Sequence, residues 1–257
     1  MNIAQHARSF PIVFSTLLIG LSPLIPVPVV DDLLTASFCR WRVKSFAARH
    51  GLILNKEEIK ILADEQQVGC FAGFTLRTFG YLFKEFWQNL LPFLEAGRAV
   101  NLLSRTYYYG VLLDYAFSEG LYKGGDPAEA QRLSHHIHEV RKGVNLRQLK
   151  ALFRASGTGT RKLSLGFIRD ISERYFKNIL VTFKKGWRQL RRQKGKFDEE
   201  ADQAAENLNE SAGTWAERYK LLFEEFYNSI AKIPDKELEE LCLALRAKMT
   251  GDVSPPL

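Results

Sequence analysis

The sequence has few cysteines, and those it has show no pairing pattern. Its 257 residues include three cysteines, Cys39, Cys70 and Cys242, which lie far apart. An odd number at such spacings excludes a disulfide framework, and the close cysteine pairs of structural zinc sites are missing. This usage is typical of a reducing compartment, so we expect a cytoplasmic protein.

The chain also lacks an unbroken apolar run of the roughly 20 residues that a membrane-spanning helix needs. Residues 9–30 carry no charge, but Pro11, Pro23, Pro26 and Pro28 interrupt them. A mean hydropathy of −0.17 excludes a protein made mostly of membrane spans. Three interpretations of residues 9–30 stay open: a signal peptide, a segment lying in a membrane interface, or a buried part of the core. In the second, the inserted side chains would be those of Leu18, Leu21, Ile25 and Val27.

Motifs for covalent catalysis and nucleotide binding are missing as well. There is no GxSxG elbow, and SGTGTRK at 156–162 has neither the lysine placement nor the preceding strand of a phosphate-binding loop. Adjacent Asp31 and Asp32 are typical of a helix start rather than of an acid–base pair. Zinc-finger spacing and RNP motifs are absent too, so nucleic acid is not an expected partner. We expect no cofactor and assign no catalytic residue.

The charge that is present is unevenly distributed. The net charge is +7, yet residues 198–257 carry 14 acidic and 6 basic residues, whereas residues 1–197 carry 15 acidic and 30 basic. This asymmetry predicts an anionic partner, or an acidic tail that folds onto a basic surface. We therefore divide the chain into an apolar N-terminal segment (1–30), a basic helical domain (31–197), and an acidic linker with a C-terminal helical hairpin (198–257).

Helix signals follow one another along the chain, and no sustained strand alternation interrupts them. Gly51 is a natural stop for a helix that starts near Asp31, and Asn55 with Glu58 forms a capping-box pattern. Asp126 followed by proline opens another helix, and Asp235 is expected to cap the last one. The pattern predicts an all-α multi-helix bundle of roughly eight to nine helices.

The helix expected over residues 163–193 is both basic and amphipathic. Large apolar side chains fall on one arc, and the neighbouring arc is entirely cationic. An aromatic side chain on the seam of such a helix suits the surface of an anionic membrane. The residues expected to contact that surface are Lys177, Lys184, Lys185, Arg188, Arg191, Arg192 and Trp187.

Histidines cluster on the helix that Asp126 opens. His135, His138 and Glu139 are spaced i, i+3 and i+4, so they share one face and offer three metal ligands. The order HHIHE differs from the HExxH order of zinc proteases. Surface histidines near a helix end are the alternative interpretation.

Residues 25–50, IPVPVVDDLLTASFCRWRVKSFAARH, carry a family resemblance. An apolar Pro-x-Pro stretch that runs into Asp and a basic helix resembles bacterial helical proteins of the EcsC type, and the GRAVNLLSRTYYYG region is similar to them as well. The resemblance implies a membrane-linked location and transfers no catalytic residue.

These observations leave three functional hypotheses. The first is a non-catalytic protein, peripheral to the inner membrane, that binds an anionic lipid surface or a protein partner. The second is a soluble scaffold or oligomerisation protein whose acidic tail docks on its basic helix. The third is a metal-dependent enzyme that uses His135, His138 and Glu139.

The first hypothesis predicts liposome binding that rises with anionic lipid content and falls with added salt, because the cationic arc supplies the attraction. Charge reversal at Arg188 and Arg191 should reduce the bound fraction in a sedimentation assay. Binding unchanged by these substitutions would contradict the assignment of the surface to this helix.

Overall fold

The computed structural model describes residues 3–21, 30–63, 98–144 and 220–251, and every element in these ranges is a helix. The all-α fold class is therefore confirmed for this part of the chain. The expected number of helices also depends on residues outside these ranges and stays a prediction. The helices are α1 (Ile3–Ala7), α2 (Phe10–Leu21), α3 (Val30–Arg49), α4 (Lys56–Leu62), α7 (Arg98–Ser118), α8 (Pro127–Lys142), α13 (Lys220–Ala231) and α14 (Asp235–Thr250).

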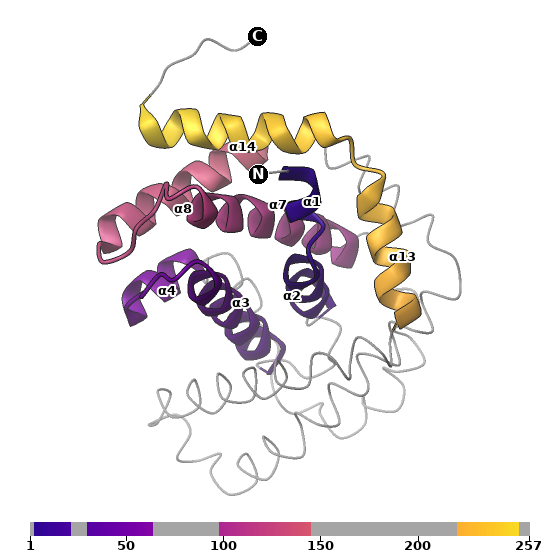
Figure 1. The fold of residues 1–257 in the computed structure, drawn as a ribbon. Coiled ribbons are helices and arrows are strands. Elements are labelled where there is room, and N and C mark those ends of the chain that lie inside the picture. The colour runs from indigo at the N-terminus through magenta and orange to yellow at the C-terminus, as the bar shows by residue number, and fades with distance from the viewer. Residues whose placement is uncertain (1–2, 22–29, 64–97, 145–219, 252–257) are drawn as a thin grey trace, which may run out of the picture.

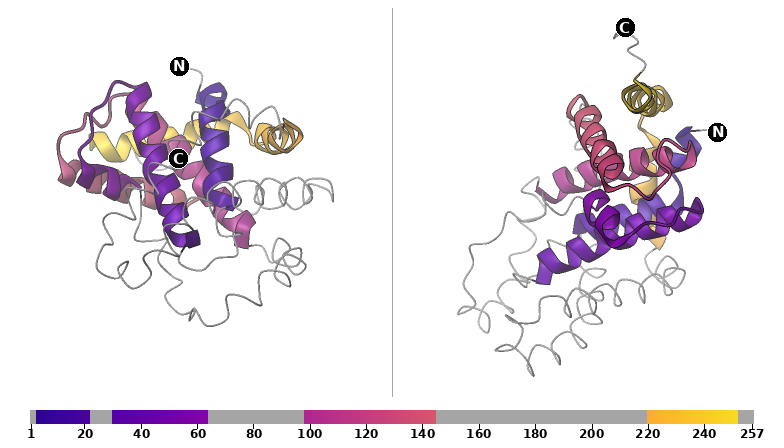
Figure 2. Two further views of the ribbon diagram at one scale, coloured as in Figure 1. Left: turned by 90° about the horizontal axis from the view of Figure 1, so that it is seen from below. Right: turned by 90° about the vertical axis from the view of Figure 1, so that its left-hand side faces the viewer.

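Helix α7 lies at the centre of this arrangement (Figure 1). Helices α2 and α3 run side by side and cross it, as the left view of Figure 2 shows. On the other side, α14 packs against both α7 and α8. All residues of α7 from Thr106 to Phe117 are buried. Because the second half of α7 has no solvent-facing side, contacts with the surrounding helices fix its orientation, and not a single apolar face.

The apolar N-terminal segment contributes α2 to this core. Side chains on all sides of α2 are buried, among them Ile12, Phe14 and Leu18, each no more than 3% exposed. Gly20 permits the contact with α7, because a Cβ atom there would lie 2.2 Å from Cδ2 of Leu103. Residues 12–20 are thus part of the core, which for this stretch of residues 9–30 agrees with the third of the interpretations left open by the sequence.

Most of the expected helix ends are confirmed. Gly51, two residues after the last residue of α3, has φ +69°, a conformation that favours glycine. The Asn55 side chain and Glu58 form the capping box of α4, and Asp126 caps α8 through the Ala128 N–H. One expectation was wrong: Pro234 is the N-cap of α14, and Asp235 makes no capping hydrogen bond because it is already the first helical residue.

The C-terminal hairpin packs on the N-terminal helices within one hydrophobic core. Leu238, Cys242 and Leu245 of α14 are fully buried, as their spacing predicts. Arg8, between α1 and α2, holds the turn between α13 and α14: its Nη2 donates to the Ile233 carbonyl oxygen at 2.9 Å and to Asp235 Oδ1 at 2.6 Å. These contacts also attach α1 to the body of the protein.

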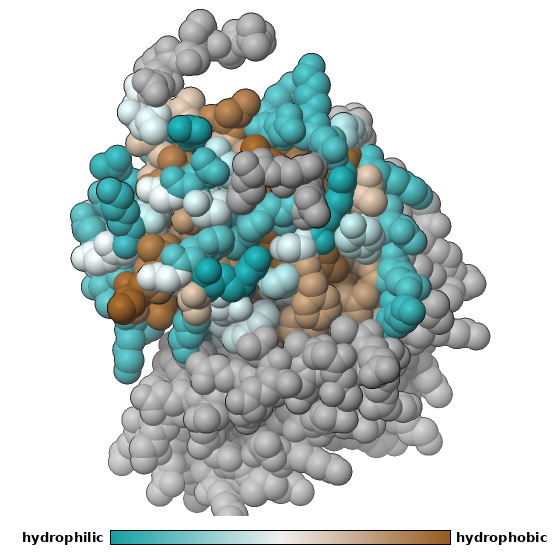
Figure 3. Space-filling model, viewed as in Figure 1, coloured by the Kyte–Doolittle hydropathy of each residue, from teal (hydrophilic) through white to brown (hydrophobic). Residues whose placement is uncertain are grey.

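No helix in the described ranges has both the length and the apolar character needed to cross a bilayer. The face shown in Figure 3 is mainly hydrophilic where residues are described, and hydrophobic side chains appear there in small separate groups.

Glu58 is a fully buried carboxylate that connects α4 to the loop before α8. Its Oε2 accepts from the Asn55 N–H at 2.8 Å, and its Oε1 accepts from the Gly125 N–H at 2.6 Å and from the Tyr122 hydroxyl. Burial alone would raise the pKa of this carboxyl, but these hydrogen bonds outweigh burial and hold the pKa below its ordinary value of 4.5.

Replacing Glu58 by Gln should destabilise the fold by about 2 kcal/mol at neutral pH, because the charge-assisted hydrogen bonds are lost and an amide N–H₂ faces other donors. The lowered pKa means that the carboxylate stabilises the fold above about pH 4.5 and loses this effect as the pH falls through its folded-state pKa. The free energies of unfolding of wild type and variant, measured in urea, should therefore converge as the pH falls below the folded-state pKa of Glu58. Glu57→Gln, at an exposed position in the same turn, is the matched control, and a Glu58 effect no larger than the control's would contradict the prediction.

Candidate functional site

The most unusual side chain of the central helix is Asp114. Its neighbours along α7, from Val111 to Phe117, are hydrophobic and buried, and the Asp114 side chain itself has no exposed surface. Taking a carboxylate out of water costs several kcal/mol unless charges and hydrogen bonds compensate it. The groups that surround Asp114 are therefore essential for the fold and are candidates for function.

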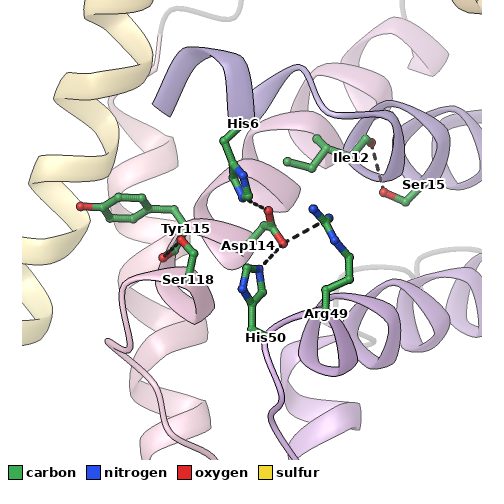
Figure 4. Close-up of polar contacts among 8 residues, drawn as sticks. All are labelled: His6, Ile12, Ser15, Arg49, His50, Asp114, Tyr115 and Ser118. Atoms are coloured by element: carbon green, nitrogen blue, oxygen red, sulfur yellow. Dashed lines mark hydrogen bonds and ion pairs between the residues drawn. The ribbon is translucent and has the colours of Figure 1, made fainter. Parts of the chain in front are cut away.

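Three side chains from two other parts of the chain converge on this carboxylate (Figure 4). Nε2 of His6, on α1, contacts Oδ2. Nε2 of His50, directly after α3, lies 3.0 Å from Oδ1. Nη1 of Arg49, the last residue of α3, lies 3.6 Å from the same oxygen. One acceptor group is thus approached by two imidazoles and one guanidinium.

The two histidines and Asp114 satisfy the spatial requirement for a metal centre. One ligand atom from each residue lies within 4.8 Å of the others. Among the histidine, cysteine, aspartate and glutamate side chains of the described ranges, these three form the group that meets this requirement. His6 Nε2 and Asp114 Oδ2 are both buried and face each other, yet neither makes a hydrogen bond of ordinary geometry there. Each of these atoms has the other as its nearest polar partner, so a metal ion would bind both by replacing this direct contact.

The electrostatics of the site favour an ionised carboxylate. Burial would raise the pKa of Asp114, but the contacts from His6 and His50 and the positive charge of Arg49 outweigh it and lower the pKa. A deprotonated carboxylate is the form that coordinates a metal ion.

Local structure explains how each histidine reaches Asp114. Gly51, in the left-handed conformation, ends α3, so the chain turns at His50 beside α7. On the other side, α1 is only five residues long and is held by Arg8, two residues after His6. His6 and His50 side chains are 19% and 17% exposed and Arg49 is 34% exposed, so the site is reached from solvent on their side.

The metal ligands expected from the sequence do not converge. Glu139 pairs with Lys248 of α14, with Oε2 2.9 Å from Nζ. Nδ1 of His138 lies 2.7 Å from Nη2 of Arg141, and the His138 ring packs on Tyr109. His135 is 66% exposed and lies 3.4 Å from Glu139. Glu139 thus links α8 to α14 and His138 packs against α7, while His135 contacts its own helix; in the described part of the chain the three form no common ligand site.

The other expected contact residues are placed as follows. Leu18 is packed in the core and does not face solvent. Leu21 ends α2, and Ile25 and Val27 lie outside the described residues, as does the helix expected over 163–193 with its cationic residues and Trp187. Binding of an anionic surface by that helix stays a prediction.

Sequence reasoning missed the site at Asp114 because its members are far apart along the chain. His50 and Asp114 are separated by 64 positions, and no local spacing relates them to His6. One signal was present: Asp114 is the single charged residue in GVLLDYAF, residues 110–117. A lone charge in an apolar run indicates a buried carboxylate that requires partners.

No family profile, curated protein or solved structure matches this chain. The resemblance to EcsC-type proteins therefore stays a prediction, and the functional argument rests on the geometry of the site.

In metal-free buffer, Asp114→Asn should destabilise the fold by about 3 kcal/mol, because Arg49 loses its buried counter-charge and the two imidazoles lose the carboxylate that they contact. Denaturant unfolding in the presence of a chelator measures this. Asp126→Asn is the matched control, since Asn caps a helix as well as Asp does. A loss for Asp114→Asn below about 0.5 kcal/mol, the size of an ordinary surface substitution, would contradict the role assigned to this carboxylate.

Proposed function

We propose that this protein binds a divalent transition-metal ion through His6, His50 and Asp114. The observation that carries the proposal is the convergence of two imidazole nitrogens and one buried carboxylate from α1, the end of α3, and α7. The hypothesis of a metal protein, raised above for His135, His138 and Glu139, is thereby moved to a different set of residues.

The chemistry of the donors selects the class of ion. Magnesium and calcium prefer all-oxygen ligands, whereas imidazole suits zinc, iron, cobalt, nickel and copper. Two histidines and one carboxylate are also the ligand set of several zinc enzymes and of non-haem iron centres. Zinc is the first choice of probe because it has no redox chemistry and tolerates the mixed nitrogen and oxygen set.

The number of protein ligands bears on the role of the ion. Structural zinc sites have four protein ligands, while sites with three leave a position open to water or another ligand. An ion held by these three residues would polarise a molecule bound at the open position. It would also strengthen the link between α1 and the core that His6 makes through its contact with Asp114, beside the Arg8 contacts and apolar packing.

Protein purified without a histidine tag should bind about one zinc ion per chain in equilibrium dialysis with elemental analysis. Loss of a residue that only supports a ligand typically weakens a metal site about 10- to 100-fold, so His6→Ala, His50→Ala and Asp114→Ala should each weaken zinc binding by at least that factor. Zinc at about 100 times its dissociation constant should stabilise the wild-type fold by about 2.7 kcal/mol.

The sequence supplies a matched control. His135→Ala and His138→Ala remove histidines from α8 and should leave zinc binding unchanged, because these side chains lie outside the proposed centre. Magnesium should not compete. Wild-type protein without stoichiometric zinc would refute the proposal, and zinc lost in the α8 variants but kept in the other three would return the site to His135, His138 and Glu139.

A further inference from the structure

Arg49 lies beside the metal centre without being one of its ligands. Its Nη1 is 3.6 Å from Asp114 Oδ1, its guanidinium lies 5.9 Å from the centroid of the Phe46 ring, and a third of its side chain is exposed. In the described part of the chain, Asp114 is the carboxylate that it contacts. Arg49 therefore faces both the carboxylate and the solvent.

The charges at this place do not balance once a metal ion is bound. A divalent ion and Arg49 bring +3, the imidazoles that coordinate an ion are neutral, and Asp114 contributes −1, which leaves +2. Among the described residues, no second carboxylate contacts His6, His50 or Arg49. Asp114 has no exposed surface, and the two histidines are about four-fifths buried, so water screens this charge poorly. A positive site of this kind attracts an anion.

The shape of the available donors narrows the anion to an oxyanion. Guanidinium presents a planar fork of N–H groups that matches two oxygens of a phosphate or carboxylate. A phosphate group carries about −1.5 to −2 charges at neutral pH, which offsets the excess, whereas a carboxylate offsets half of it. Three protein ligands leave a coordination position that one of these oxygens can occupy.

We infer that Arg49 and the open position of the metal together form a binding site for a small phosphate-type anion. The inference rests on the proposed function, because without the ion Arg49 is neutralised by Asp114 and no excess positive charge remains. Arg49 and, to a smaller extent, the two imidazoles reach solvent, so the anion would approach the site from their side.

The test uses the full chain loaded with cobalt, whose visible spectrum reports a change of ligand at the metal. Titration with inorganic phosphate should change the spectrum of the wild-type protein in a saturable way, and acetate should bind more weakly than phosphate. Metal-free protein should bind phosphate at least about tenfold more weakly, measured by calorimetry.

Arg49→Ala should retain cobalt and weaken phosphate binding about 10- to 100-fold, the value of a charge-assisted hydrogen bond. The phosphate affinity of Arg49→Lys should lie between those of the wild type and Arg49→Ala, since lysine keeps the charge and loses the planar fork. Arg132→Ala, at an exposed position on α8, is the control and should bind phosphate like the wild type.

The outcomes separate the two proposals. Cobalt binding without any phosphate response, or with equal phosphate affinity in wild type, Arg49→Ala and Arg49→Lys, would overturn the anion site and leave the metal centre standing. Failure of the wild-type protein to bind cobalt or zinc would overturn both. If Arg49→Ala fails to bind cobalt, the phosphate affinity of Arg49→Lys is the deciding measurement. A phosphate affinity of Arg49→Lys equal to that of the wild type would overturn the anion site.

Discussion

The burial of the Asp114 carboxylate inside α7 is the constraint around which the described core is arranged. An ionised group with no exposed surface must be compensated by partners, and the neighbouring residues of α7 are apolar and provide no charged partner. His6, His50 and Arg49 provide them from outside the helix. The positions of α1 and of the end of α3 are therefore tied to one side chain. A site that gathers nitrogen donors around a carboxylate for stability also gathers metal ligands.

Two buried carboxylates, Glu58 and Asp114, each specify how different helices pack against one another. Apolar contacts among α2, α3, α7 and α14 supply most of the free energy but tolerate several arrangements. Glu58 specifies how α4 meets the loop before α8, and Asp114 specifies how α1 and α3 meet α7. Each accepts donors from segments distant in sequence, so each selects one arrangement among many of similar apolar burial. Their surroundings differ in one respect: Glu58 accepts from backbone amides and a tyrosine hydroxyl, whereas Asp114 faces imidazoles that also ligate metals.

The histidines of α8 show why local spacing is a poor guide to a ligand site. His135, His138 and Glu139 share a helix face, but their partners are Lys248 on another helix and Arg141 on the same one. Those basic groups occupy one oxygen of Glu139 and one ring nitrogen of His138. A site is formed where the neighbouring elements bring further ligands, and at Asp114 the neighbours bring two histidines. Arg49 is the cation there, and it remains partly in solvent.

The sequence by itself determined the helical class, the stop at Gly51, the capping box of Asn55 and Glu58, the start at Asp126 and the apolar face of α14. These features depend on residues within one or two turns of each other, so local hydrogen bonding and periodicity decide them. Only the tertiary structure decided that α2 is a core helix, that α14 packs on α7, and that His6, His50 and Asp114 meet. Such contacts join residues many turns apart, and their register depends on how whole helices pack, which no local pattern encodes.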